Sequence, residues 1–150
     1  VNANAGKGGC LDGGKRDFES SEREHVTVLL IDDNPLQLSV REAVLRNADF
    51  SVTVATTADS ALATVRSLGK CVGIIVTDHI MPGRSGSEFV RLLRQENTWV
   101  PVIVLSGLPE AAAEYDGMGV TFRQKPLPPQ DLIALVREHI RNKSPQTGAA

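Results

Sequence analysis

Residues 71–86 read CVGIIVTDHIMPGRSG, and this stretch decides the fold of the chain. Its apolar run ends abruptly at Asp78, and a polar turn with Pro82, Gly83 and Gly86 follows. The run lacks a two-residue alternation, as expected when both faces of a strand are buried in a parallel sheet. The pattern therefore predicts a buried parallel strand that brings Asp78 to the carboxyl edge of a sheet, where open α/β sheets build their sites.

Further apolar runs indicate that the same unit is repeated along the chain. Strands are expected at residues 26–31, 51–55, 73–77, 100–105 and 119–123. Helical patterns follow them at residues 35–44, 58–68, 87–96, 110–115 and 128–140. This order predicts an α/β fold, a five-stranded parallel sheet with helices on both faces, in (βα)5 order and with a shortened fourth helix.

Local signals predict where the first two helices begin and end. Proline suits the first turn of a helix, so the first helix is expected to begin at Pro35. Its apolar side chains recur at helical spacing, and they are Leu36, Val40, Ala43 and Val44. The second helix is expected between Thr57, as its cap, and Gly69, which would end it.

Composition bounds the class of protein. A chain of 150 residues predicts one domain, and its net charge of -2 leaves no electrostatic footprint for nucleic acid or for an anionic membrane. No apolar run approaches the roughly 18 residues that a membrane helix requires. We therefore expect a cytoplasmic domain that contacts neither nucleic acid nor a membrane directly.

Three segments are expected along the chain. Residues 1–24 are rich in glycine and lack periodicity, which predicts a flexible tail or linker. Residues 25–142 would form the folded domain, and residues 143–150 a loose tail. The two cysteines, Cys10 and Cys71, do not make a disulfide framework and are expected to be free thiols of a reducing compartment.

Polar residues follow the predicted strands where each of them ends. Asp32 and Asp33 follow the first strand, Asp78 the third, Ser106 the fourth and Lys125 the fifth. Three carboxylates at one edge repel one another unless a cation lies among them, and hard oxygen ligands favour Mg²⁺. A carboxylate can accept a phosphoryl group when a metal and a lysine offset its repulsion. The residues therefore predict a Mg²⁺-assisted site for phosphoryl transfer to an aspartate.

This set of strand ends resembles the receiver domain of two-component response regulators, which is similar to flavodoxin in architecture. The resemblance covers about residues 26–141. It rests on four motifs, namely Asp32-Asp33, Asp78 with Met81-Pro82-Gly83 and Gly86, Ser106-Gly107, and Lys125-Pro126. It implies that Asp78 accepts a phosphoryl group from the phosphohistidine of a histidine kinase or a histidine phosphotransfer protein.

The resemblance also implies a ligand set for Mg²⁺. Asp33 and Asp78 would bind the ion directly, together with the backbone carbonyl of Ile80. Asp32 would act through water. A short helix cap is the plainer interpretation of Asp32 and Asp33, since acidic residues favour helix N-termini.

Other residues are implied to bind the phosphoryl group or to respond to it. Ser106 and Lys125 would hold its oxygens. Phe122 occupies the position of the family's switch aromatic, although an aromatic in a short strand is also typical of plain core. Ile80 and Leu108 would flank the phosphoryl group, and neither can orient a water, which predicts slow hydrolysis.

Some features stay open at this point. His79 is expected to be a loop or core histidine without a catalytic role, because neighbours along a strand point to opposite faces. Arg84 is either an exposed loop cation or a contact for a partner. The short fourth helix puts dimerisation through that face in doubt, so the oligomeric state is left open.

The resemblance favours a signalling domain that does not turn over a substrate. The sequence TDHIMPGRSG at residues 77–86 and the short fourth helix resemble those of receivers attached to hybrid histidine kinases. One rival is an aspartate-nucleophile phosphatase, but such enzymes carry a second aspartate two positions after the nucleophile, where this chain has Ile80. The other rival is an interaction module of the same fold that works without phosphorylation.

Overall fold

The computed structural model describes residues 26–143, so the predicted tail at 1–24 and almost all of the predicted tail at 143–150 lie outside the described part. Strands and helices alternate along the described chain. Their bounds are β1 Thr27–Ile31, α1 Pro35–Asn47, β2 Ser51–Ala55, α2 Ala58–Leu68, η3 Gly69–Cys71, β3 Val72–Asp78, α3 Gly86–Glu96, β4 Val102–Ser106, η4 Pro109–Tyr115, β5 Val120–Gln124 and α4 Pro129–Lys143, where η marks a 3₁₀ helix.

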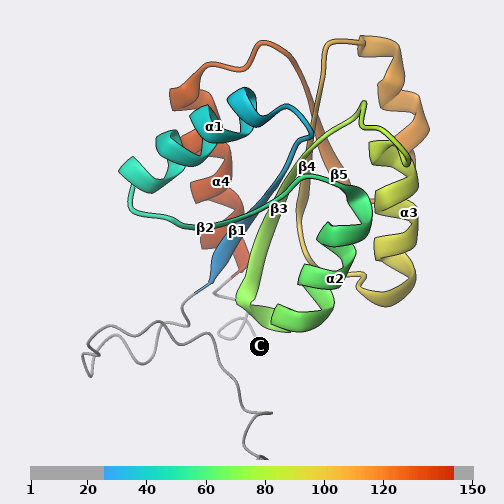
Figure 1. Cartoon of the computed structure of the whole chain (residues 1–150), viewed down its shortest axis with the longest axis horizontal. Coiled ribbons are helices and arrows are strands. Elements are labelled where there is room, and N and C mark those ends of the chain that lie inside the picture. The colour runs from blue at the N-terminus through green and yellow to red at the C-terminus, as the bar shows by residue number, and fades with distance from the viewer. Residues whose placement is uncertain (1–25, 144–150) are drawn as a thin grey trace, which may run out of the picture.

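The five strands form one parallel sheet in the order β2-β1-β3-β4-β5. The predicted fold is thereby confirmed. β3 lies in the middle and is buried along its whole length, as its unbroken apolar run predicts. Because all strands run the same way, their carboxyl ends meet at one edge (Figure 1).

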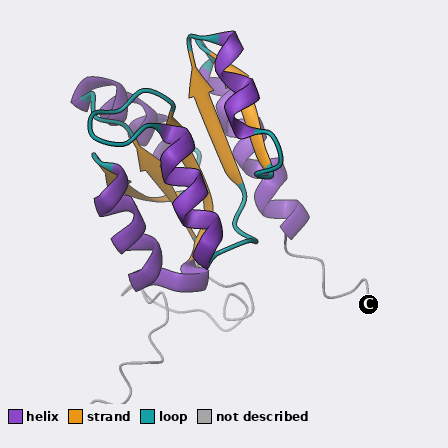
Figure 2. Cartoon of the chain, turned by 90° about the vertical axis from the view of Figure 1, so that its right-hand side faces the viewer, coloured by secondary structure: helices purple, strands orange, loops and turns teal. Residues whose placement is uncertain are grey.

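Helices cover both faces of the sheet. Side chains of α1 and α4 pack on one face, with Leu45 and Val136 fully buried there. Side chains of α2 and α3 pack on the other face, around Phe89. Figure 1 shows these two pairs on either side of the strands, and Figure 2 shows the strands running between the helices. The sheet therefore presents only its edges and strand ends to the surface.

The first helix forms as predicted but buries a different stripe. Leu38 and Leu45, which are seven residues apart, face the sheet, whereas Leu36 and Val40 are 72% and 54% exposed. This orientation turns two polar side chains of α1 toward the carboxyl edge of the sheet. The helix was therefore predicted correctly, but Leu36 and Val40 lie on its exposed side and not on the side that packs against the sheet.

The predicted helix boundaries agree with the capping geometry. Thr57 accepts a hydrogen bond from the backbone N–H of Ser60, and Gly69 ends α2 with a positive φ of 55°. Ser85 and Glu88 form a reciprocal capping box at the start of α3. This cap fixes the direction in which the chain leaves the turn after Asp78.

The fourth helical segment is short, as expected. η4 covers seven residues, is a 3₁₀ helix, and begins without a side-chain cap. The 3₁₀ helix has poorer hydrogen-bond geometry than the α-helix and is used in short pieces. The face built by this segment is therefore smaller than the faces built by the α-helices.

Cys71 is disulfide-bonded, so the prediction that it is a free thiol is wrong. It is half-buried and ends η3, directly before β3. Cys10 lies outside the described residues. The expectation of a reducing compartment therefore loses the support that a free Cys71 would give it. Within residues 26–143, every helix is too short or too polar to cross a membrane.

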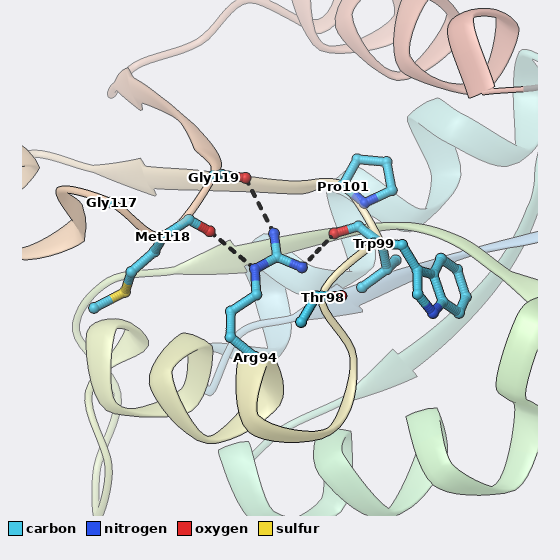
Figure 3. A pocket seen from close by; sticks show the side chains of 8 residues that line it. Arg94, Thr98, Trp99, Pro101, Gly117, Met118 and Gly119 are labelled. Carbon is cyan, nitrogen blue, oxygen red and sulfur yellow. Dashed lines mark hydrogen bonds between the residues drawn. The ribbon is translucent and has the colours of Figure 1, made fainter. Parts of the chain in front are cut away.

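Arg94 clasps the amino edge of the sheet, at the end opposite Asp78. From α3, its guanidinium donates to the carbonyls of Met118, Gly119 and Val100 at 2.9, 3.0 and 2.8 Å (Figure 3). The clasp lines a pocket of about 350 Å³ whose other walls include Trp99. Since the guanidinium is occupied by carbonyls, we assign Arg94 a structural role.

Replacing Arg94 with Leu is expected to lower the free energy of unfolding by about 2 kcal/mol, because several partly buried carbonyls lose a charged donor. Chemical denaturation of the two proteins would measure the difference. The matched control is Arg91→Leu on the same helix, an exposed position where we expect a change within about 0.5 kcal/mol. An equal change in the free energy of unfolding at both positions would contradict a stabilising role for the hydrogen bonds of Arg94.

Candidate functional site

Three carboxylates meet at the carboxyl edge of the sheet. Asp32 and Asp33 follow β1, Asp78 ends β3, and one oxygen of each lies within 4.8 Å of the others. Asp32 and Asp78 are buried, with 1% and 6% of their surface exposed, whereas Asp33 is exposed. The predicted acidic cluster is thus assembled, with one open side through Asp33.

Lys125 follows β5, the edge strand of the sheet, and its side chain reaches into this cluster. Its Nζ lies 2.6 Å from Asp78 Oδ1 and forms an ion pair with it. The backbone N–H of Lys125 donates to the carbonyl of Ser106 at 2.8 Å, which holds the lysine beside the end of β4. Asp78 Oδ1 is buried, and among residues 26–143 it has the ammonium as an ion-pair partner but no donor aligned as a hydrogen bond.

The surroundings raise the pKa of Asp78 above its usual range. Burial is the largest cause, and the negative charge of Asp32 adds to it. Lys125 opposes both through its close contact at 2.6 Å and its charge, and Arg41 opposes them more weakly. In the metal-free protein, Lys125 and Arg41 therefore do not fully offset the cost of burying an ionised Asp78 beside Asp32.

Ser106 lies at the end of the neighbouring strand. It is buried and follows Leu105, which is paired with Asp78 across β3 and β4. Its Oγ accepts the backbone N–H of Leu108 at 2.9 Å, so the hydroxyl is engaged in its own turn. The sheet brings this hydroxyl to the predicted edge, and its contact with a phosphoryl group stays a prediction.

Phe122 is half-buried in β5 and packs against the core on the α2 and α3 face. Its ring lies 5.9 Å from the ring of Tyr115, tilted by 45°. This packing agrees with the interpretation of Phe122 as a core residue. The switch interpretation stays a prediction.

The sequence did not predict a polar network behind Asp78, which is buried at His79 and Tyr115. His79 Nδ1 and the Tyr115 hydroxyl are 2.6 Å apart, and His79 Nε2 lies 3.7 Å from Glu114, which accepts from the Ser87 hydroxyl at 2.8 Å. His79 is buried, as expected of a core histidine. Burial raises the pKa of Tyr115, so its hydroxyl stays protonated. The network ties the end of β3 to η4.

Gly86 is needed where this network meets α3. A Cβ there would lie 2.6 Å from the Tyr115 hydroxyl and 2.7 Å from the carbonyl of Asp78. Both distances are far below van der Waals contact, so even alanine would displace the turn. The glycine therefore allows α3 to begin directly against the site.

Arg41 is a further residue of the site that the sequence did not reveal. Its Nη1 donates to Asp32 Oδ2 at 2.7 Å, and the other oxygen of Asp32 accepts the N–H of Asn34 at 2.9 Å. Gln37, one turn earlier on α1, lies 3.4 Å from both Arg41 and Lys125. The four-residue spacing of Gln37 and Arg41 marks one helix face, which was the available signal.

Arg84 is an exposed cation of the loop after β3. Its Nε donates to Asp59 Oδ1 of α2 at 3.0 Å, and both side chains are exposed. An exposed ion pair of this kind contributes at most about 1 kcal/mol. The position agrees with the loop-cation interpretation.

The residues of the cluster fit a magnesium ion. Their donors are hard carboxylate oxygens that lie close together, and the buried Asp78 Oδ1 lacks an aligned hydrogen-bond donor within the described chain. Mg²⁺ prefers such ligands and keeps several waters, which the exposed side at Asp33 would admit. Asp33 and Asp78 would hold the ion directly and Asp32 through water, and the carbonyl of Ile80 stays a predicted further ligand.

Comparison with known proteins assigns this arrangement. Residues 28–137, which include every charged residue of the site, match the response regulator receiver domain. The chain belongs to this family. Receiver domains of two-component systems interact with histidine kinases, which supports the predicted class of partner.

Relatives of this receiver domain occur in bacteria and plants. The two-component response regulator ARR17 of Arabidopsis thaliana is 30% identical over 145 residues, covering 85% of this chain and 92% of ARR17. The transcriptional regulatory protein DctD of Pseudomonas aeruginosa, named for C4-dicarboxylate transport, is 33% identical over 114 residues, covering 73% of this chain and 24% of DctD. The solved receiver protein of Pseudomonas putida has a TM-score of 0.70 at 28% identity, covering 76% of this chain and 97% of its own.

The receiver domain is only part of several relatives. This chain spans 21% to 52% of the lengths of four of them, DctD among them. The activities of those whole proteins are therefore not transferred to it.

Proposed function

We propose that Asp78 accepts a phosphoryl group from the phosphohistidine of a histidine kinase or a histidine phosphotransfer protein, in a Mg²⁺-dependent reaction that switches the conformation of the domain. One observation carries this proposal. Asp78 is a buried carboxylate with a lysine ammonium 2.6 Å away and two further carboxylates beside it. A purely structural role would leave this concentration of charge unexplained.

The chain's own residues account for most of the reaction. An oxygen of Asp78 attacks phosphorus, the P–N bond of the phosphohistidine breaks, and its electron pair returns to the imidazole nitrogen. Lys125 holds an oxygen of the transferred group by charge, and the Ser106 hydroxyl donates to another when its O–H turns away from the carbonyl of Leu108. Asp33, Asp78 and the Ile80 carbonyl would hold Mg²⁺, with Asp32 acting through water, and the bound ion would supply positive charge for the phosphoryl oxygens.

The rim of the site suits a protein donor. Leu36, Ile80 and Leu108 lie near the strand ends and are 72%, 63% and 41% exposed. Apolar side chains around a charged centre favour a partner that presents a histidine from an apolar surface. Phosphotransfer assays with candidate kinases would identify the donor.

The proposal is tested by treating the full chain with a small phosphodonor, such as acetyl phosphate, and Mg²⁺. We expect a gain of one phosphoryl group in the intact mass, lost on treatment with hydroxylamine, and no gain when EDTA replaces Mg²⁺. Beryllofluoride with Mg²⁺ is expected to shift amide resonances around Asp78 and in η4. A chain that responds to neither reagent would instead be an interaction module that works without phosphorylation.

The acyl phosphate on Asp78 is expected to hydrolyse slowly for this family. Ile80 and Leu108 flank the site, and their apolar side chains cannot orient an attacking water. Decay of the labelled protein after donor removal, in the presence of Mg²⁺, measures the lifetime. We expect minutes or longer, and a shorter lifetime for Ile80→Gln, which can orient water. Decay of the wild type within seconds is the contrary outcome.

A further inference from the structure

Arg41 places a second cation against the acidic cluster. Its guanidinium lies 2.7 Å from the fully buried Asp32, and its own side chain is only 17% exposed. It extends from the second turn of α1, which is turned so that Leu38 and Leu45 are buried and Gln37 and Arg41 lie toward the strand ends. This contact is not a surface ion pair, since one partner is buried.

The charge balance of the site depends on this residue. Three carboxylates face two cations, Lys125 and Arg41, which leaves one net negative charge. Without Arg41 two negative charges would remain for the metal. One of the two oxygens of Asp32 is also occupied by the guanidinium, and the other by the N–H of Asn34.

We propose that Arg41 is a built-in counter-ion of the acidic cluster that competes with Mg²⁺ for Asp32 and so sets a weak affinity for the ion. This inference rests on the proposed metal site. Arg41 is a positioning residue in this role, because it acts through Asp32 and not on the phosphoryl group. Gln37 assists it, since its side-chain oxygen lies 3.4 Å from Arg41 and from Lys125 and spaces the two cations.

The consequence is that a higher concentration of the divalent ion is needed to occupy the site. Arg41 reduces the repulsion within the cluster in the metal-free protein, so the folded domain does not depend on Mg²⁺ for that purpose. The ion, or the water through which Asp32 would hold it, must then displace or share the Arg41 contact with Asp32. A unit charge several ångströms away changes the binding of a divalent ion by about tenfold in a partly solvated site.

The test is a calorimetric titration of Mg²⁺ into the metal-free full chain and its variants. Arg41→Met keeps the length of the side chain and removes its charge, and Arg41→Gln keeps a donor for Asp32 without the charge. The control is Arg66→Met, which removes an exposed guanidinium paired with Glu96 near the other end of the sheet. Thermal unfolding of each protein in EDTA establishes that it is folded.

We expect both Arg41 variants to bind Mg²⁺ about tenfold more tightly than the wild type, and Arg66→Met to bind within twofold of it. The rise of Tm on adding Mg²⁺ should be larger for the Arg41 variants, by linkage. A merely structural arginine would lower Tm in EDTA without tightening Mg²⁺ binding. Equal or weaker binding by the Arg41 variants, with binding by the wild type intact, overturns this inference alone. Absence of Mg²⁺ binding in every protein overturns the metal site of the proposed function together with it.

Discussion

Replacing Asp78 with Asn is expected to abolish phosphorylation of this chain by any donor. The amide has the shape of the carboxylate but no anionic oxygen to attack phosphorus. Apart from Asp78, no carboxylate within residues 26–143 combines burial with a lysine ammonium at such a distance. Labelling from acetyl phosphate and from a histidine kinase would both be measured by intact mass. The expected loss is complete within detection.

A matched carboxylate elsewhere controls for this result. Asp116 is exposed in the turn after η4, and Asp116→Asn changes the net charge equally. It should be labelled like the wild type. Labelling of Asp78→Asn at an unchanged rate would move the phosphoacceptor to another residue and remove the basis of the proposed function.

The same substitution has a predictable effect on stability. The folded-state pKa of Asp78 is raised by burial, so at neutral pH its ionised form destabilises the metal-free fold. Asp78→Asn mimics the neutral carboxyl and is expected to raise the free energy of unfolding by on the order of 1 kcal/mol in EDTA. Because a raised pKa means that the folded state binds the proton more tightly, this advantage should disappear as the pH falls through the pKa of Asp78. Denaturation at several pH values measures it.

Replacing Lys125 with Met is expected to slow phosphoryl transfer to Asp78 by about a hundredfold. The ammonium offsets the negative charge of both the acceptor and the incoming group, and the Met side chain keeps only its bulk. Initial rates of labelling by acetyl phosphate with saturating Mg²⁺ measure the loss. The control is Lys70→Met in η3, an exposed position at the other end of the sheet, where the rate should not change.

Loss of Lys125 also has a pH signature. The lysine lowers the pKa of Asp78, so its removal raises that pKa further and leaves an uncompensated buried carboxylate. Lys125→Met should therefore be less stable than the wild type at neutral pH, and the difference should shrink in acid, where a protonated Asp78 gains nothing from an ammonium. A difference that is constant with pH would indicate lost packing instead of a lost ion pair.

The sequence was sufficient for the strand ends because parallel topology leaves little freedom. Once β1, β3, β4 and β5 are recognised as parallel strands, Asp32, Asp78, Ser106 and Lys125 must meet at one edge. The caps at Thr57 and Ser85 are likewise local, since a side chain bonds to a backbone a few residues away. Signals that act over short distances survive in a single sequence.

Contacts between side chains far apart in the chain could not be predicted. His79 and Tyr115 are 36 residues apart, and their hydrogen bond depends on how η4 lies over α3. Arg41 depends on the rotation of α1 about its axis, which was ambiguous because both Leu36 and Leu38 head helical stripes. Packing decides each of these, and periodicity alone does not.

The weak capping of η4 has a consequence for how the domain transmits a signal. Its 3₁₀ hydrogen bonds have poor geometry, and its first residues lack a side-chain cap, so the free energy of opening this segment locally is low. The capped helices α2 and α3 open at greater cost. A modest displacement of the Ser106 turn, which leads directly into η4, can then reorder an entire surface segment at small energetic expense while the opposite edge stays clasped by Arg94. The proposed phosphorylation of Asp78 would then reach the surface through η4, the segment that follows the Ser106 turn.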